Sequence, residues 1–183
     1  AFLNPYEFVT AGLYTKALGE IGSGNEKGIA TSRDGISGVT FENVDFGEYG
    51  SDELILPIFA LSDEAVDIEI WLGTPHEAGS RLLDTVVYQK PSIWNVYQEE
   101  TYQLPERIKG VATIAFMLKT KVHIKGFLFR KQEKAFGTLY GGEANAVYGD
   151  TFTRDGNVIR GIGNNVTIVY DNMDFGQQGA DCV

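Results

Sequence analysis

The sequence predicts an all-β protein, an antiparallel β-sandwich of the jelly-roll kind, followed by an incomplete second copy. Many short segments rich in β-branched and aromatic residues follow one another, with turn-forming residues between them. No convincing helical pattern separates these segments, and short strands at regular spacing favour a sandwich or a barrel. The second copy is predicted because one stretch of sequence occurs twice.

The predicted strands follow from alternation and residue type. Ile68 and Ile70 alternate with Asp67 and Glu69, which is the pattern of a half-buried strand. The predicted strands, in chain order, cover residues 39–41, 54–59, 66–72, 82–88, 94–104, 109–118, 122–129 and 166–170. Turns are expected at 47–50, 73–75, 90–92 and 104–106. Pro57 is expected on an edge strand or at a bulge, since it cannot donate to a ladder.

Two irregular stretches are predicted. Residues 19–38 are rich in glycine and lack a clear period, so we expect a long mobile loop over one end of the sandwich. The polar segment 130–134 is expected to be the linker between two modules.

The repeat divides the chain. Residues 42–52 return as 171–181 at a constant offset of 129. Solenoid units recur every ~20–50 residues, so this is a domain period. We predict one sandwich at 1–132 and the N-terminal part of a second, similar module at 133–183. Because the chain starts without Met and the second copy stops at Val183, we expect an excised fragment of a longer protein.

Composition limits the partners. The net charge of −10 argues against nucleic acid and against an anionic membrane surface. The longest apolar run, 111–118, is shorter than the ~20 residues that span a bilayer. Cys182 is the single cysteine, which predicts no internal disulfide and leaves the compartment open between cytoplasmic and secreted bacterial. Asn165 heads a glycosylation sequon that matters only in a secreting eukaryote.

Catalytic patterns are missing from the sequence. His76 and His123 are the only histidines, no HExxH or CxxC motif occurs, and no Ser, His and acid set stands out. The carboxylate pairs at 63–64 and 99–100 are interpreted as a solvated acidic surface, because glycosidase carboxylates need a deep cleft. Gly161 to Gly163 is interpreted as a turn. We therefore assign no catalytic residue and predict that this chain is not an enzyme.

Two tryptophans are candidate ligand contacts. Trp71 falls on the polar side of its strand, where an exposed indole could stack on a sugar ring. The alternative is that Trp71 packs under a loop or against a neighbouring domain. Trp94 lies at a junction between loop and strand, where a ligand-facing role and a core role are both open.

Residues 39–129 resemble a family 6-type carbohydrate-binding module, a β-sandwich jelly roll. The segments that carry this likeness are 43–46, 68–72, 92–97 and 123–127. More closely, the runs 41–53, 88–98, 148–152 and 161–166 are similar to the C-terminal region of bacterial glycoside hydrolase family 2 β-galactosidases. The resemblance implies a non-catalytic accessory module of such an enzyme.

The resemblance also implies site residues. The tryptophan at the position of Trp94 stacks the sugar, and its aromatic partner would fall at Thr40, so Phe41, Tyr49 or Tyr97 would have to substitute. The hydrogen-bonding asparagine of the family aligns with His123, which can donate and accept. We therefore expect ligand contacts from Trp94, Asn95, Tyr97 and His123, with Trp71 as the next candidate.

A structural calcium is the cofactor that the resemblance implies. Glu7 is the candidate first ligand. The second ligand position aligns with Lys125, which cannot coordinate a cation. We expect no cofactor.

Two functions stay open. The module either binds carbohydrate, a galactoside or a plant or host glycan, or serves as a structural spacer that stabilises the parent catalytic domain or its oligomer. Residues 134–183 supply too few strands to enclose a core, so we also expect a homodimer through this region. Tyr140, Tyr148, Phe152 and Phe175 would be buried at that contact.

Overall fold

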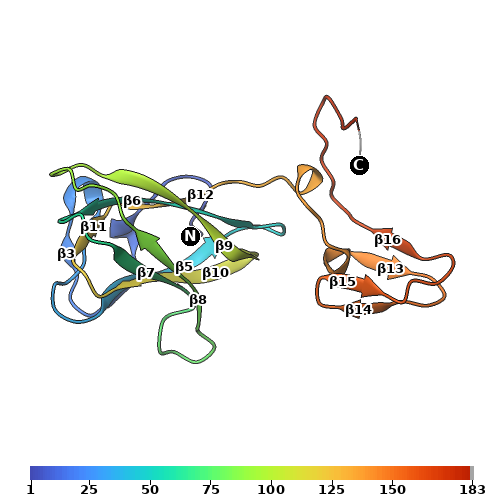
Figure 1. The fold of residues 1–183 in the computed structure, drawn as a ribbon, viewed down its shortest axis with the longest axis horizontal. Coiled ribbons are helices and arrows are strands. Elements are labelled where there is room, and N and C mark those ends of the chain that lie inside the picture. Colours follow the sequence, from blue (N-terminus) through green and yellow to red (C-terminus); the bar gives the residue numbers. More distant parts are fainter. Residues whose placement is uncertain (182–183) are drawn as a thin grey trace. The chain divides into compact units, whose positions relative to one another are not determined.

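The computed structural model describes residues 1–181, and Cys182 and its predicted lack of a disulfide lie outside them. The chain forms two compact units, Ala1–Lys131 and Gln132–Val183, which we call unit 1 and unit 2 (Figure 1). Strands dominate unit 1, whereas unit 2 has short strands joined by loops. The helical segments are short 3₁₀ turns, η1 (Ala11–Leu13), η2 (Asn25–Lys27), η3 (Lys134–Phe136) and η4 (Gly141–Glu143). Within residues 1–181 no helix is long and apolar enough to cross a membrane.

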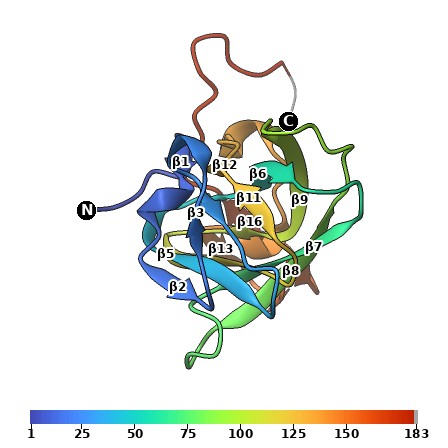
Figure 2. The same ribbon diagram turned by 90° about the vertical axis from the view of Figure 1, so that its left-hand side faces the viewer.

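Unit 1 is an antiparallel β-sandwich, which confirms the predicted fold class. One sheet runs in the order β1-β12-β6-β11-β4-β3, with β9 on the other side of β6, and the other sheet runs β2-β5-β10-β7-β8. In Figure 2, β6, β11 and β12 lie above β5 and β8. The first sheet contains β1 (Val9–Thr10), β3 (Gly22–Ser23), β4 (Ile29–Ala30), β6 (Ser51–Ala60), β9 (Gln98–Ile108), β11 (Val122–Ile124) and β12 (Gly126–Phe129). The second contains β2 (Lys16–Leu18), β5 (Ser37–Asp45), β7 (Val66–Leu72), β8 (Arg81–Tyr88) and β10 (Val111–Leu118).

The core lies between the two sheets and is centred on aromatic rings. Phe127 of β12 is fully buried, with its ring centroid 4.9 Å from that of Phe41 on β5 and 5.7 Å from that of Phe116 on β10. Alternation places Ile68 and Ile70 of β7 in the same core. Inward side chains from both sheets therefore hold the sandwich together.

Three local predictions were wrong, and each has a backbone reason. Residues 94–97 belong to a loop, because β9 begins only at Gln98. The predicted turn at 104–106 lies inside β9, where the register against β6 shifts; among the described strands β9 pairs with β6 alone, so Pro105 is tolerated. The predicted loop 19–38 contains β3, η2 and β4, since Ile29 is buried in the core.

Pro57 lies on a central strand, not on an edge. β6 pairs with β9 on one side and with β11 and β12 on the other. Ile124 pairs with Ile58 and Leu128 with Ile55, so β11 and β12 together contain one residue more than β6 over this span. Pro57 thus lies beside a bulge, the second of the two predicted environments.

Unit 2 has the local architecture of the N-terminal part of unit 1. Its strands are β13 (Ala146–Tyr148), β14 (Thr153–Asp155), β15 (Val158–Arg160) and β16 (Thr167–Val169). β13 pairs with β16 as β2 pairs with β5, and β14 pairs with β15 as β3 pairs with β4. Ala146 faces Val169 where Lys16 faces Thr40 in unit 1.

The repeated turn sequence also folds alike in the two units. The Asp45 carboxylate accepts from Gly47 N–H at 3.0 Å, and Asp174 accepts from Gly176 N–H at 2.8 Å. Asn43 and Asn172 both have positive φ, 58° and 54°. The same residues therefore impose the same local turn twice.

Candidate carbohydrate-binding site

Trp94 stands on a loop that is tied to the end of β6. The Ser92 hydroxyl donates to the Ala60 carbonyl at 2.7 Å, and Ser92 N–H donates to Asp63 Oδ1 at 2.6 Å. Asn95, with φ of 58°, turns the chain directly after Trp94. The indole is 81% exposed and meets the Phe59 ring edge-on, with centroids 5.6 Å apart. A large apolar ring is thus held in solvent on a fixed support.

Phe59 and His123 form the floor beside Trp94. They are paired residues of β6 and β11, and their ring centroids lie 5.1 Å apart. Phe59 is 5% exposed, and His123 Nδ1 is buried without a hydrogen-bond partner among residues 1–181. Burial lowers the pKa of His123, and the positive charge of Lys121 lowers it further. His123 is therefore a neutral imidazole at pH 7, able to donate from one nitrogen and accept at the other.

Tyr97 and Asn95 connect this loop to η2. The Tyr97 hydroxyl donates to the Asn25 carbonyl at 3.0 Å, and the Asn25 amide donates to the Asn95 side-chain oxygen. Burial raises the pKa of Tyr97, and Glu26 adds to this effect, so the phenol stays protonated. We call Asn25, Phe59, Trp94, Asn95, Tyr97 and His123 the Trp94 platform.

Trp71 lies elsewhere. It belongs to β7 in the other sheet, where it is half-buried and its indole N–H donates to Glu69 Oε2 at 2.9 Å. Its ring centroid is 6.3 Å from that of His76 in the β7–β8 loop. The structure thus brings together four of the predicted contacts, Trp94, Asn95, Tyr97 and His123, and separates the fifth.

The expected aromatic partners of Trp94 do not all reach it. Thr40 and Phe41 are buried in β5 of the other sheet, and the Thr40 hydroxyl has no hydrogen-bond partner in the described part of the chain. Tyr49 lies in the turn after β5, with the Arg107 guanidinium 4.1 Å from its ring centroid. The implied ring position at Thr40 is therefore wrong for this chain, because β5 packs against the core. Tyr97 is the remaining candidate for a second ring.

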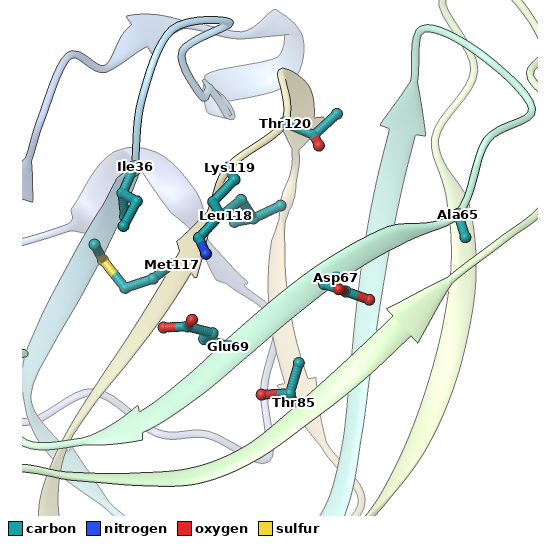
Figure 3. A pocket seen from close by; sticks show the side chains of 9 residues that line it. All are labelled: Ile36, Ala65, Asp67, Glu69, Thr85, Met117, Leu118, Lys119 and Thr120. Carbon is teal, nitrogen blue, oxygen red and sulfur yellow. The ribbon is translucent and has the colours of Figure 1, made fainter.

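Hollows of unit 1 include one of about 660 Å³ beside η2, which Lys27 and Gly28 help to line, and two near the β6–β7 and β10–β11 loops. The loop-end hollow, of about 380 Å³, is lined by Arg33, Ala60, Leu61, Ser62, Val66, Lys119, Thr120, Lys121 and Val122. The sheet-face hollow, of about 170 Å³, lies on the five-stranded sheet. Figure 3 shows the carboxylates of Asp67 and Glu69 and the hydroxyl of Thr85 on this hollow's β7 and β8 side. Lys119 lines both hollows. Arg33 and Lys121 make the loop-end hollow cationic, and Asp67 and Glu69 make the sheet-face hollow acidic.

Known structures share this architecture at low sequence identity. A family 6 carbohydrate-binding module from Clostridium stercorarium, solved in complex with cellobiose, has a TM-score of 0.59 and 22% identity, covering 72% of this chain and 98% of that chain. A β-1,3-glucan-binding family 6 module from Bacillus halodurans has a TM-score of 0.56 and 23% identity, covering 72% and 100%. This is the family 6 carbohydrate-binding module fold.

The same fold occurs inside an enzyme. A glycoside hydrolase family 43 arabinoxylan arabinofuranohydrolase from Bacillus subtilis, solved with cellotetraose, has a TM-score of 0.57 and 20% identity, covering 72% of this chain and 28% of that chain. No family model and no curated protein matches the sequence significantly. The comparisons thus show the family 6 module fold and give no support to a family 2 β-galactosidase parent.

The calcium that the module fold implies does not fit the residues present. Glu7 is exposed, and no group of three or more His, Cys, Asp or Glu within residues 1–181 could hold a metal ion. At the expected second ligand, the Lys125 ammonium lies 2.6 Å from a Glu26 carboxylate oxygen and 5.9 Å from the ring centroids of Phe8 and Tyr97. A fixed positive charge there repels a cation, so no chemistry is assigned to calcium.

Several residues of the site were missed by sequence reasoning. Phe59 supports Trp94, Asn25 holds Asn95, and Lys121 lies in the loop directly before the strand of His123. Lys121 gave no strand signal, because it lies outside both the predicted strand 122–129 and β11. Phe59 and Asn25 gave no signal, since contacts between distant segments of the chain bring them to the Trp94 loop.

Proposed function

We propose that unit 1 is a non-catalytic carbohydrate-binding module that binds sugar on the Trp94 platform. The observation that carries this proposal is the 81% exposed Trp94 indole, held by the buried Phe59 and the tethered Ser92. Ile93 and Val96 beside Trp94 are also exposed, and a cluster of exposed apolar side chains is typical of a binding surface. Modules with the same fold were solved with cellobiose and with cellotriose, which supports the choice of carbohydrate.

The platform offers both parts of sugar recognition. The C–H face of a pyranose ring is apolar and stacks on the face of an indole. The neutral imidazole of His123 and the amide of Asn95 supply hydrogen bonds to hydroxyl groups beside that ring. One stacked ring and a few exchanged hydrogen bonds give an affinity nearer millimolar than nanomolar, about −4 to −6 kcal/mol.

For the parent protein we propose a β-galactosidase-like glycoside hydrolase, with a galactoside or a plant or host glycan as ligand and the catalytic domain as covalent neighbour. The support for this finer assignment is the residue resemblance of 41–53 and 88–98. The occurrence of the fold within a family 43 enzyme supports the broader idea of a glycoside hydrolase.

A glycan array followed by titration calorimetry tests the proposal. We expect Trp94→Ala to abolish binding of whichever oligosaccharide the intact chain selects, because the stacking surface is lost. Trp71→Ala, which removes the half-buried indole of the other sheet, is the matched control and should retain binding. Equal binding by Trp94→Ala would place the site elsewhere, with Trp71 as the next candidate.

The alternative is a structural spacer that binds no sugar. It is favoured by Thr40, which stands where the resemblance implies an aromatic ring and lies buried in the other sheet. An array without any bound glycan, together with a lower melting temperature of the parent enzyme after deletion of unit 1, would support the spacer.

A further inference from the structure

The loop-end hollow is a cationic site within an acidic protein. It opens where the β4–β5, β6–β7 and β10–β11 loops meet, and these loops contribute Arg33, Ser62 and Lys121. None of the described residues that line it carries a carboxylate, although the chain has a net charge of −10. Asp34, Asp63 and Glu64 flank it in sequence, and the Asp63 carboxylate accepts from Ser92 N–H.

The cations of this hollow have no ionic partner in the part of the chain that the structure describes. Several other cations of unit 1 are paired: Lys16 with Glu42 and Glu77, Arg81 with Glu106, Lys90 with Glu100, Lys125 with Glu26, and Arg130 with Glu53. Arg33 and Lys121 form no ion pair within residues 1–181. Lys119 also borders the acidic sheet-face hollow, so Arg33 and Lys121 are the charges left for a ligand.

The hollow lies next to the Trp94 platform, because Ala60 and Val122 of its lining adjoin Phe59 and His123 in the chain. Ala60, which lines it, accepts the hydrogen bond that anchors the Trp94 loop through Ser92. Lys121 directly precedes β11, which carries His123, and His123 packs against Phe59 beneath Trp94. The charge of Lys121 also reaches His123, since it contributes to the lowered pKa of that imidazole. The hollow and the platform therefore lie at the same ends of β6 and β11.

We infer that the ligand of the Trp94 platform is an acidic glycan, whose carboxylate or sulfate group is bound by Arg33 and Lys121 in the loop-end hollow. This inference rests on the proposed function and names its ligand class. The guanidinium matches a carboxylate or sulfate with two parallel hydrogen bonds, and the ammonium adds a point charge. The hydroxyls of Ser62 and Thr120 can donate to the remaining oxygens.

Calorimetry on the intact chain with matched oligosaccharides tests the inference. The probes are a galactose oligomer, the galacturonate oligomer of equal length and a sulfated galactose oligomer. We expect at least one acidic probe to bind about tenfold more tightly than the neutral probe at low salt, and this preference should fall as salt rises. The better acidic probe distinguishes a uronate from a sulfate ligand.

Two double variants separate a site from general charge. Arg33→Gln with Lys121→Met should remove the preference and leave neutral binding unchanged. Arg81→Gln with Lys131→Met makes the same change in net charge at positions outside the hollow and the platform and should keep the preference. Equal loss in both double variants would overturn the inference.

The inference and the proposed function fail differently. If neutral and acidic probes bind equally and Trp94→Ala abolishes both, the acidic ligand is wrong and carbohydrate binding stands. If no probe and no array glycan binds, both are wrong. Circular dichroism of each variant confirms that the sandwich is retained.

Discussion

At the scale of the residue, the surroundings of His123 determine its protonation state. It is paired with Phe59 across β6 and β11, its Nδ1 is buried without a partner among the described residues, and Lys121 lies two residues before it. Burial and this positive neighbour both disfavour the imidazolium, so the pKa of His123 falls below 6.5. The residue is consequently neutral when a sugar would bind.

His123 predicts a pH dependence of stability. Because its pKa is lower in the folded than in the unfolded state, the unfolded chain binds more protons below pH 6.5. The stability of the fold with a neutral His123 is fully present above pH 6.5, and it is lost as the pH falls through the lower pKa of the folded state. We expect His123→Gln to lose less stability than the natural chain across this window, measured by denaturant unfolding at each pH. Parallel curves for the two proteins would contradict this.

At the scale of the element, the β5–β6 turn depends on two glycines of different kinds. Gly47 has φ of 69° and open space where a methyl group would stand, whereas Gly50 has φ of 77° and a methyl group there would lie 1.9 Å from the Ile108 carbonyl oxygen. A positive φ raises the energy of any L-residue with a side chain at either position. Only at Gly50 would a side chain also clash with the backbone of β9.

These glycines give a matched pair of substitutions. We expect Gly47→Ala to cost about 1–2 kcal/mol, the cost of a left-handed L-residue. Gly50→Ala should cost clearly more, since the turn must also move away from β9. Tryptophan fluorescence during urea unfolding reports on unit 1 alone, because Trp71 and Trp94 are the only tryptophans. An equal loss of unfolding free energy in the two variants would contradict this, because it would mean that the turn moves away from β9 without cost.

At this scale the strand predictions also differ in accuracy. The alternation of 66–72 predicted β7 with its observed bounds, because one face of β7 is core and the other is not. Residues 94–97 were predicted as the start of the strand 94–104, yet they belong to the loop that carries Trp94, since Ser92 and Asn95 fix a turn there through tertiary hydrogen bonds. Site residues on such loops are invisible to periodicity.

At the scale of the whole molecule, unit 2 holds two separate strand pairs. β16 matches β5 of unit 1, and β5 has β2 on one side and β10 on the other. Within residues 1–181, β16 pairs with β13 alone. Tyr140 is 50% and Tyr148 63% exposed. An uncharged strand edge beside exposed rings favours association.

We therefore expect the chain to form a homodimer through residues 134–183, with Tyr140, Tyr148, Phe152 and Phe175 buried at the contact. Light scattering on residues 1–183 against residues 1–132 measures this, and only the longer protein should have twice its monomer mass. Ile168→Pro, on the strand with the open edge, should return the longer protein to a monomer. Monomers in both cases, with rapid proteolytic trimming of unit 2, would contradict the dimer.

We also expect the chain to have no glycosidase activity. In the described part of the chain, the carboxylates of the pairs 63–64 and 99–100 do not line either hollow, and Glu99 is exposed on β9. Aryl galactosides incubated with the purified chain should remain intact, with a β-galactosidase as positive control. Turnover that persists in a preparation free of contaminating enzyme would refute this expectation.

The sequence by itself determined the sandwich, the strands with one buried face, and the repeated turn of 42–52 and 171–181. These features are local, because alternation and turn chemistry act over a few residues. Four of the predicted contacts, Trp94, Asn95, Tyr97 and His123, also meet in space. Only the tertiary structure decided that Phe59 supports Trp94, that Trp71 lies on the other sheet, and that Arg33 and Lys121 share one hollow. The physical reason is strand pairing: register between distant segments decides which side chains meet, and no local pattern encodes it.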